Sequence, residues 1–233
     1  MHLSVVVPCF DEKANILRFE DELFPVLDNL GIPYEVVAVD DGSSDGSFEV
    51  LKKLGLRQPK LRSVAHAENR GLGAALRTGF AAAKGDWIVT LDADLTFSPS
   101  LVKDLLARQK ETGADMVGGS PFLSGGGFRG VPWARSVPSL LVNVFYRGLF
   151  DRRLTAYTPI LRLYRASLLR ALPLASEGFE INAEIAARLI QAQRRFSEIP
   201  AELSVRSEGV SKLNGLRELR RHACLIIRLQ SRP

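Results

Sequence analysis

The sequence is poor in cysteine, contains no long hydrophobic run and begins without a recognisable leader. Only two cysteines, Cys9 and Cys224, occur in 233 residues, so a disulfide framework is not expected and a reducing compartment is the default. No apolar run approaches the ~18 residues that a membrane-spanning helix requires. The first residues, MHLSVVVPCF, lack the basic start and the apolar stretch of a signal peptide. We therefore expect a cytoplasmic protein, or one bound peripherally to the cytosolic face of a membrane.

Two further absences exclude whole classes of protein. No segment repeats with a fixed period, which excludes solenoids and propellers. Lysine and arginine number 31 against 26 aspartate and glutamate, and much of the excess lies in the final third of the chain. Because these basic segments lack the interleaved aromatic residues of a single-stranded nucleic-acid groove, we expect a local basic surface and no nucleic-acid partner.

What the chain does contain is a series of strand-and-helix units. Hydrophobic residues make up 46% of the sequence and charged residues 24%, enough for one large domain or one domain with an appendage. Four apolar runs, starting near residues 3, 34, 61 and 87, each lead through a polar turn into a helical pattern. This order predicts an α/β fold, with a mostly parallel twisted sheet covered by helices on both faces. In such sheets ligands bind outside the carboxyl ends of the strands.

The segment VTLDADLTF ends a buried run in two carboxylates, Asp92 and Asp94. Residues i and i+2 of an extended chain point to the same side, so both carboxylates can face one point just past the strand end. Such oxygen ligands suit Mg²⁺ or Mn²⁺ rather than zinc, and a metal held in this way most often neutralises a diphosphate. The alternative is a polar loop after a buried strand.

Polar residues also follow the first two strands, at residues 8–12 and 40–45. The carboxyl ends of parallel strands meet at one edge of the sheet, so three acidic loops should converge there. Such loops repel a bare phosphate and favour a metal ion or a nucleoside as the partner. Ser43 or Asp45 could instead cap the helix that starts near Gly46.

The glycines of NRGLGAAL resemble part of a dinucleotide-binding fingerprint. Gly71 and Gly73 come well after the first strand, however, and Leu76 occupies the third glycine position, which disfavours nicotinamide and flavin enzymes. Glycine here allows the backbone to approach a bound nucleotide or sugar closely. The alternative is a helix start packed tightly on the sheet.

A set of motifs resembles glycosyltransferase family 2, most closely its branch of dolichol-phosphate mannosyltransferases and other polyprenyl-phosphate glycosyltransferases. The set comprises VVVPCFDEKANI, VDDGSSDGS, ENRGLGAALRTGF, LDADL, GGSPFLSGGG, SEGFEINAEI and GVSKL. It implies a nucleotide-diphospho-sugar transferase (GT-A) domain over residues 1–213, with a nucleotide-binding half at about 1–120 and an acceptor half at about 121–213. Residues 214–233 would then form a basic amphipathic helix.

The resemblance also implies a reaction. A sugar of mannose or glucose type would move, with inversion, from a GDP- or UDP-sugar to a polyprenyl or dolichyl phosphate, with Mg²⁺ or Mn²⁺ as cofactor. An acceptor phosphate has a second pKa of about 6 and is already an anion at neutral pH. It therefore needs cations to position it rather than a general base.

The resemblance assigns roles to individual residues. The donor-binding residues would be Pro8, Phe10, Glu12, Asp40, Asp41, Gly73, Asp92 and Asp94, with Asp92 and Asp94 also holding the metal. The acceptor-binding residues would be Arg135, Ser139, Asn143, Arg206, Ser211 and Lys212. Asp94, Arg135 and Ser139 would act directly in catalysis.

Two apolar segments in the second half allow alternative placements. SLLVNVFYRGLF, directly after Pro138, could be buried core or a lipid-facing helix. LRELRRHACLIIRLQSRP places apolar residues on one helical face with arginines around it, and could lie on a membrane surface or pack against the domain. That apolar face consists of Leu216, Leu219, Ala223, Ile226 and Ile227.

Several positions depart from the family pattern and leave the sugar and the acceptor open. Thr96 stands where the branch usually has glutamine, Pro121 where relatives commonly carry an arginine, and residues 158–160 replace a polar run. One alternative function is therefore transfer to the hydroxyl of a saccharide or small molecule, with Glu180 as the base. Another is a non-catalytic nucleotide-sugar-binding subunit. A membrane-protein partner or a homo-oligomer also remains open.

Overall fold

The computed structural model describes residues 1–131, 133–205 and 215–230, and for residues 133–138, 215 and 216 it describes the backbone only. The strands are β1 (Leu3–Cys9), β2 (Tyr34–Asp40), β3 (Leu61–Ala65), β4 (Trp87–Thr90), β5 (Met116–Ser120), β6 (Gly127–Arg129), β7 (Arg162–Arg165), β8 (Phe196–Pro200) and β9 (Glu202–Ser204). The helices are α1 (Lys13–Leu17), the π-helical turn η1 (Phe19–Leu23), α2 (Phe24–Asp28), α3 (Ser47–Arg57), α4 (Leu72–Ala82), α5 (Leu101–Thr112), α6 (Trp133–Leu149), α7 (Ala166–Ala171), α8 (Ile181–Gln191) and α9 (Gly215–Gln230).

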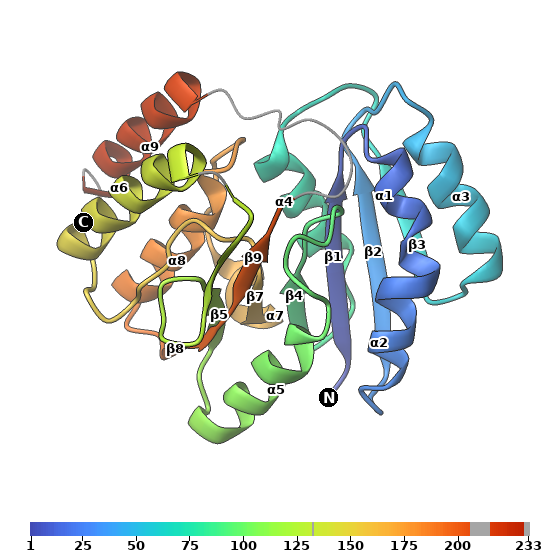
Figure 1. Cartoon of the computed structure of the whole chain (residues 1–233), viewed down its shortest axis with the longest axis horizontal. Helices are drawn as coiled ribbons and strands as arrows, with labels where there is room; N and C mark the ends of the chain where they lie inside the picture. Colours follow the sequence, from blue (N-terminus) through green and yellow to red (C-terminus); the bar gives the residue numbers. More distant parts are fainter. Residues whose placement is uncertain (132, 206–214, 231–233) are drawn as a thin grey trace.

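A mostly parallel sheet forms the centre of the molecule (Figure 1). Its strand order is β3-β2-β1-β4-β7-β5-β8, and a separate pair joins β6 to β9. The pairs β1–β2, β1–β4, β2–β3 and β5–β8 are parallel, whereas β7 runs antiparallel to both β4 and β5. The α/β fold with a mostly parallel sheet is thus confirmed.

Helices cover both faces of this sheet, and the strand residues alternate between the two layers. Val5 and Val7 of β1 pack in one core cluster with α1, η1, α2, α3 and α5, whereas Val6 packs in the other with α4, α7, α8 and α9. Successive side chains of a strand point to opposite faces, so a strand buried on both sides must be apolar throughout. The uninterrupted apolar runs of the sequence follow from this requirement.

The helical region after β1 is divided into three pieces rather than forming one continuous helix. The π-helical turn η1 separates α1 from α2, and Pro25 occupies the first turn of α2. Proline has no backbone N–H to donate within a helix, and the first turn is the position where that donor is not needed. The sequence pattern predicted helix here but not this division.

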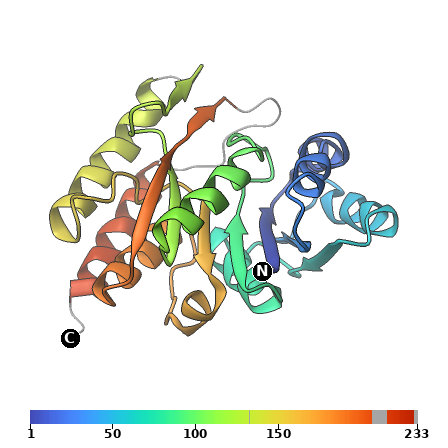
Figure 2. The same cartoon turned by 90° about the horizontal axis from the view of Figure 1, so that it is seen from below.

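Helices α6 and α9 lie together at one end of the molecule, opposite α1 and α3 (Figures 1 and 2). The Tyr146 hydroxyl of α6 and Nδ1 of His222 in α9 are 3.0 Å apart and buried. Leu225 and Leu229 of α9 are buried in the core cluster of that face. The last helix therefore packs against the domain, although part of its surface stays exposed.

Across the described ranges, we find no helix that combines the length and the apolar character needed to cross a bilayer.

Candidate active site

A cavity of about 210 Å³ opens at the carboxyl ends of β1, β2 and β4. We call it the strand-end cavity. Because the three strands are parallel, the loops that follow them emerge at the same edge, as the sequence predicted. Its walls include Pro8, Phe10, Glu12, Asp41, Gly71, Asp92 and Asp94. Six of the eight predicted donor-binding residues therefore line one cavity, and only Asp40 and Gly73 do not.

Asp41 organises the loop that borders this cavity. Its carboxylate accepts hydrogen bonds from the backbone N–H groups of Arg70 at 3.0 Å and Gly71 at 2.7 Å. Nδ1 of His66 lies 2.6 Å from the same carboxylate, and Nε2 of His66 lies 2.9 Å from the Thr78 hydroxyl. Asp41 thus fixes the start of α4 as well as forming part of the cavity wall.

Asp40 lies beneath the loop and does not line the cavity. It is buried, and its Oδ2 accepts a hydrogen bond from the Ser43 N–H at 3.1 Å. Burial and the Asp40 carboxylate raise the pKa of the Cys9 thiol, so this cysteine stays neutral and is a poor nucleophile or ligand. We assign Asp40 to loop structure rather than to direct nucleoside contact.

Gly73 is a packing glycine. Its N–H donates to the Glu177 carbonyl at 2.7 Å, and a Cβ at this position would collide with the Ser176 carbonyl oxygen. The close backbone approach that the sequence suggested is therefore made by residues 176–177 of the same chain, not by a ligand.

Of the two capping candidates, Asp45 accepts from the N–H of Ser47 at the start of α3.

Asp92 and Asp94 lie on a wall shared by two cavities. Asp94 is buried, and its Oδ1 accepts a hydrogen bond from the Thr96 N–H at 3.1 Å. The Thr96 hydroxyl lies 3.5 Å from Oδ2 of Asp92. Leu95 between them has a φ of 53°, a left-handed conformation that side-chain-bearing residues rarely adopt outside functional turns. Thr96 therefore orients both carboxylates, a role the sequence did not reveal.

These two carboxylates fit a divalent cation that is shared with a phosphate-bearing ligand. Mg²⁺ is usually held by one or two protein carboxylates together with substrate phosphate oxygens and water. Among the described residues, no group of three or more His, Cys, Asp or Glu side chains is placed to hold a metal by itself. The protein would thus supply Asp92 and Asp94, and the ligand would complete the coordination.

A second cavity, of about 250 Å³, extends from this pair of carboxylates to α6. We call it the α6 cavity. Its wall includes Thr96, Ser139 and Thr158, and the Ser139 and Thr158 hydroxyl oxygens are 2.9 Å apart. Asn143 is buried behind them, where its Nδ2 donates to the Ser139 carbonyl at 2.8 Å and to the Thr158 hydroxyl at 3.1 Å. Ser139 is therefore placed to contact a ligand, whereas Asn143 positions Ser139.

Four predicted acceptor-binding side chains cannot be placed. Three of these residues lie outside the described residues: Arg206, Ser211 and Lys212. The fourth is Arg135, of which only the backbone is described. Glu180, the candidate base, lines neither the strand-end cavity nor the α6 cavity. It faces a third cavity against α9.

Two arginines of α9 were missed by the sequence analysis. Arg217 and Arg221 line the strand-end cavity together with Asp92 and Asp94. They are four residues apart and so lie on one side of the helix, which is a signal that the sequence does contain. Their role was hidden because nothing local shows that α9 folds back toward the ends of β1 and β4.

Comparison with known proteins identifies the family. Residues 4–172 match the family model described as Glycosyl transferase family 2. The chain belongs to glycosyltransferase family 2. The match covers β1 to α7 and so includes the strand-end loops and both carboxylates of the pair.

Curated relatives of this family member share about a third of its residues. It is 31% identical to dolichol-phosphate mannosyltransferase of Pyrococcus furiosus, over 92% of this chain and 60% of the relative. It is 33% identical to undecaprenyl-phosphate 4-deoxy-4-formamido-L-arabinose transferase of Edwardsiella ictaluri, over 90% and 62%. It is 30% identical to polyprenol monophosphomannose synthase of Mycolicibacterium smegmatis, over 91% and 80%. The chain thus spans about three fifths of the length of the first two.

Solved structures support the fold of this chain. Glucosyl-3-phosphoglycerate synthase of Mycobacterium tuberculosis, in complex with Mn²⁺, UDP and phosphoglyceric acid, superimposes with a TM-score of 0.74 at 21% identity. The alignment covers all of this chain and 79% of that structure. At this identity the likeness concerns the fold, which is that of the nucleotide-sugar transferases.

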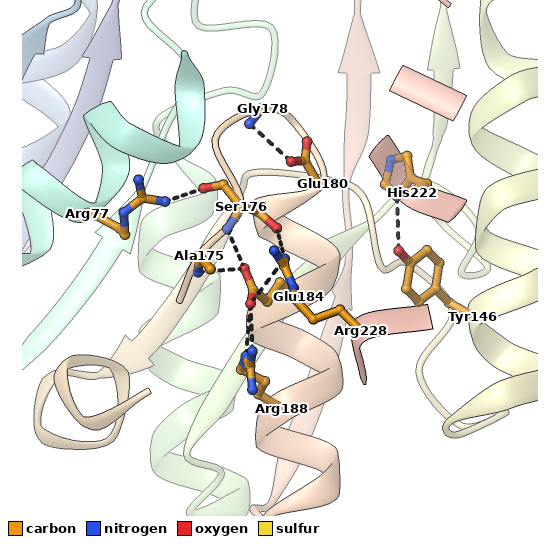
Figure 3. A network of polar contacts seen from close by, with 10 residues as sticks. All are labelled: Arg77, Tyr146, Ala175, Ser176, Gly178, Glu180, Glu184, Arg188, His222 and Arg228. Atoms are coloured by element: carbon orange, nitrogen blue, oxygen red, sulfur yellow. Dashed lines mark hydrogen bonds and ion pairs between the residues drawn. The ribbon is translucent and has the colours of Figure 1, made fainter. Parts of the chain in front are cut away.

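A buried carboxylate holds the 175–178 segment in place (Figure 3). Glu184 of α8 accepts hydrogen bonds from the N–H groups of Ala175 and Ser176, and it forms ion pairs with Arg188 at 2.9 Å and Arg228 at 3.4 Å. Burial alone would raise the pKa of Glu184, but the hydrogen bonds from Ser176, Arg188 and Ala175 outweigh it and hold the pKa below its ordinary value. Glu184 is therefore structural, and it connects α8, α9 and the segment that packs on Gly73.

Acid should weaken this connection. A carboxyl group whose pKa is lower in the folded state stabilises the protein above its unfolded pKa, and it loses that contribution as pH falls through the folded value. We expect the free energy of unfolding to decline from about pH 5 downward. Glu184→Gln should lower the free energy of unfolding by about 3 kcal/mol at pH 7, because two arginines lose their partner. It should also make the free energy of unfolding depend less on pH in the acid range. Urea unfolding between pH 3 and 8 measures both, and the exposed pair member Glu111, changed to Gln, is the control. An unchanged acid slope in Glu184→Gln would contradict this assignment.

Proposed function

We propose that this glycosyltransferase moves a sugar from a nucleoside diphosphate donor to a polyprenyl phosphate at a membrane surface. The observation that carries the proposal is the position of the α6 cavity. It begins at Asp92 and Asp94, contains Ser139, and so reaches a helix with an exposed apolar face. The names of the three curated relatives, which mention dolichol phosphate, undecaprenyl phosphate and polyprenol monophosphomannose, support the same acceptor class.

The exposed face of α6 suits a lipid environment. Leu140, Leu141, Val144, Phe145 and Leu149 are each 44 to 65% exposed, and their spacing places them on one side of the helix. On the adjacent α9, Leu219 and Ile227 are also exposed. Helices that present apolar residues beside arginines typically lie in the interface plane of a membrane. We therefore propose residues 1–213 as the catalytic domain and α9, with α6, as its membrane-docking surface.

The donor site proposed here is the strand-end cavity. Pro8, Phe10 and Glu12 would border the nucleoside, with Asp41 keeping the loop at residues 70–71 in place. Asp92 and Asp94 would hold Mg²⁺ or Mn²⁺, oriented by Thr96. When bound, the cation supplies positive charge to the diphosphate that departs from the sugar. Asp92 and Asp94 would contribute by being held in position before the reaction begins. Charges that are already in place stabilise the departing diphosphate without any rearrangement of the protein during the reaction.

The acceptor site proposed here is the α6 cavity. An acceptor phosphate approaching from α6 would meet Ser139 and the sugar on the side opposite the diphosphate, which is the geometry of an inverting displacement. Such a phosphate is already ionised and requires no general base. Proximity and orientation, rather than proton transfer, would then be the main contribution of the second half of the chain.

The geometry gives less support to a hydroxyl acceptor that uses Glu180 as base. Oε1 of Glu180 accepts a hydrogen bond from the Gly178 N–H at 3.3 Å. Its carboxylate borders the cavity at α9 instead of the α6 cavity where an acceptor would meet the sugar. A general base must lie within hydrogen-bond reach of the proton that it removes.

The direct test is transfer of radiolabelled sugar into an organic-extractable product. Purified protein would be incubated with Mg²⁺ or Mn²⁺, a polyprenyl phosphate, and a panel of GDP- and UDP-sugars. Label in the lipid phase that disappears with EDTA is the expected result, and it also identifies the sugar. Release of nucleoside diphosphate only when saccharides are added would favour the hydroxyl acceptor. Donor binding with neither signal would point to a non-catalytic subunit.

Membrane docking by α6 can be tested separately with Phe145→Glu. Burying a phenylalanine side chain contributes about 1.5–3 kcal/mol, so we expect vesicle binding to weaken by about 10- to 100-fold. Co-sedimentation with phospholipid vesicles measures the loss. The control is Leu56→Glu on α3, which removes a leucine that is 87% exposed at the other end of the molecule. Equal vesicle binding by the two variants would refute docking through α6.

A further inference from the structure

A third cavity, of about 270 Å³, lies between residues 178–180 and the outer part of α9. Its charged lining consists of Glu180, Arg217, Arg220, Arg221 and Arg228, and we call it the arginine cavity. Arg217 and Arg221 also border the strand-end cavity, so the two cavities share part of a wall. Neither the proposed donor nor the proposed acceptor occupies the arginine cavity.

The guanidinium groups of this cavity are partly fixed by the protein. Arg228 donates to the Ser176 hydroxyl at 2.8 Å and pairs with Glu184, while Arg221 pairs with Glu218 at 2.9 Å. Glu184 also pairs with Arg188, and Nε of Arg217 lies 3.9 Å from Glu218. Within the described ranges, no ion pair involves Arg220. The lining itself contains four guanidinium groups and one carboxylate, so positive charge dominates it, in the planar fork geometry that matches phosphate oxygens.

Glu180 is the unusual member of this lining. Only 5% of the residue is exposed, and its Oε2 is buried without a hydrogen-bond partner among the described residues. Figure 3 shows its other oxygen directed to the Gly178 N–H. Gly178 leaves room for the side chains of Arg221 and Glu180. A Cβ at this position would collide with the Arg221 guanidinium and lie 2.6 Å from Oε2 of Glu180. Buried polar atoms of this kind are rare in folded proteins and call for a partner.

We propose that the arginine cavity binds a phosphate ester that also carries a hydroxyl group. The phosphate would contact Arg220 together with Arg217 or Arg221, and the hydroxyl would donate a hydrogen bond to Oε2 of Glu180. The lining is mostly guanidinium groups and offers no large apolar surface, so it suits a small polar group. A phospholipid headgroup and a free phosphate ester share this chemistry. Binding of a ligand in the arginine cavity does not require that the protein catalyse sugar transfer.

Binding of two matched soluble probes to the full chain tests the proposal. Glycerol 3-phosphate carries hydroxyl groups, and methyl phosphate carries the same charge without them. We expect calorimetric titration to show at least threefold tighter binding of glycerol 3-phosphate. Glu180→Met should abolish that preference without weakening methyl phosphate, because it removes both acceptor oxygens and the negative charge. Arg220→Gln should weaken both ligands at least threefold, and Arg194→Gln, an equal charge change at an exposed site outside the cavity, should weaken neither.

Vesicles distinguish the two sources of the ligand. If the natural ligand is a lipid headgroup, vesicles of phosphatidylcholine with phosphatidylglycerol will bind the native protein more tightly than Arg220→Gln, and phosphatidylcholine alone will not distinguish them. If it is a free phosphate ester, only the soluble probes will respond to the substitution. Equal affinity of the native protein for the two soluble probes would overturn the proposal, as would normal binding of both by Arg220→Gln.

Discussion

Asp94→Asn is expected to reduce sugar transfer by about 10³-fold, because a cation at a departing diphosphate stabilises the transition state by several kcal/mol. The substitution preserves the shape of the side chain and an oxygen that can accept from the Thr96 N–H. It removes the negative charge that a divalent cation requires. Transfer rates at saturating Mg²⁺ or Mn²⁺, together with titration of Mn²⁺ followed by electron paramagnetic resonance, measure the effect. We expect both activity and donor-dependent Mn²⁺ binding to be lost.

The matched control for this experiment is Asp104→Asn on α5. This aspartate is exposed and lies outside both cavities, so transfer and Mn²⁺ binding should remain native. A folded Asp94→Asn protein that retained transfer would remove the carboxylate pair from the reaction. Loss of transfer with normal Mn²⁺ binding would instead limit Asp94 to positioning the donor.

Arg162→Met is expected to lower the free energy of unfolding by about 3–5 kcal/mol, the usual cost of leaving buried charged or polar groups without their partner. Arg162 lies on β7 and is fully buried. Its guanidinium donates to the carbonyls of Asn182, at 2.5 Å, and Ala156, at 2.8 Å. The Arg162 charge also lies near Glu198. Burial raises the pKa of Glu198 and the Arg162 charge lowers it, so the substitution should raise that pKa further. Urea unfolding at neutral pH measures the change.

Arg165→Met, three residues further along the same strand, is the control. Its side chain is 42% exposed and pairs with Asp115 at 3.0 Å. Exposed ion pairs typically contribute about 0.2–1 kcal/mol, so this variant should be nearly as stable as the native protein. Similar losses in both variants would show that charge on β7, rather than the buried hydrogen bonds of Arg162, decides stability.

The strand-end cavity could be predicted from the sequence because it depends on a topological rule. Apolar runs indicated parallel strands, and parallel strands bring their following loops to one edge. Pro8, Glu12, Asp41, Asp92 and Asp94 were therefore placed together correctly without knowledge of any side-chain contact. Local spacing alone predicted that Asp92 and Asp94 face the same side.

The features that the sequence did not reveal all involve contacts between distant segments. Gly73 was expected near a ligand, but residues 176–177, more than a hundred positions later, occupy that space. Glu180 was considered as a base, although it turns toward α9. Arg217 and Arg221 were overlooked because a helix pattern does not say which element it packs against. Tertiary packing decides such roles, and one sequence does not contain that information in local form.

The order in which the cavity walls are synthesised has a consequence for production of the protein. The first walls of the strand-end cavity belong to β1 and β2, whereas Arg217 and Arg221 come from the last helix. The segment at residues 175–178 sits between Gly73 and Arg228 and depends on both. Translation proceeds from the N-terminus at about 5–20 residues per second, so a nascent chain carries Asp92 and Asp94 well before Arg217 and Arg221. A ribosome-bound chain arrested before α9 should therefore contain most of the sheet but lack the α9 wall of the strand-end cavity.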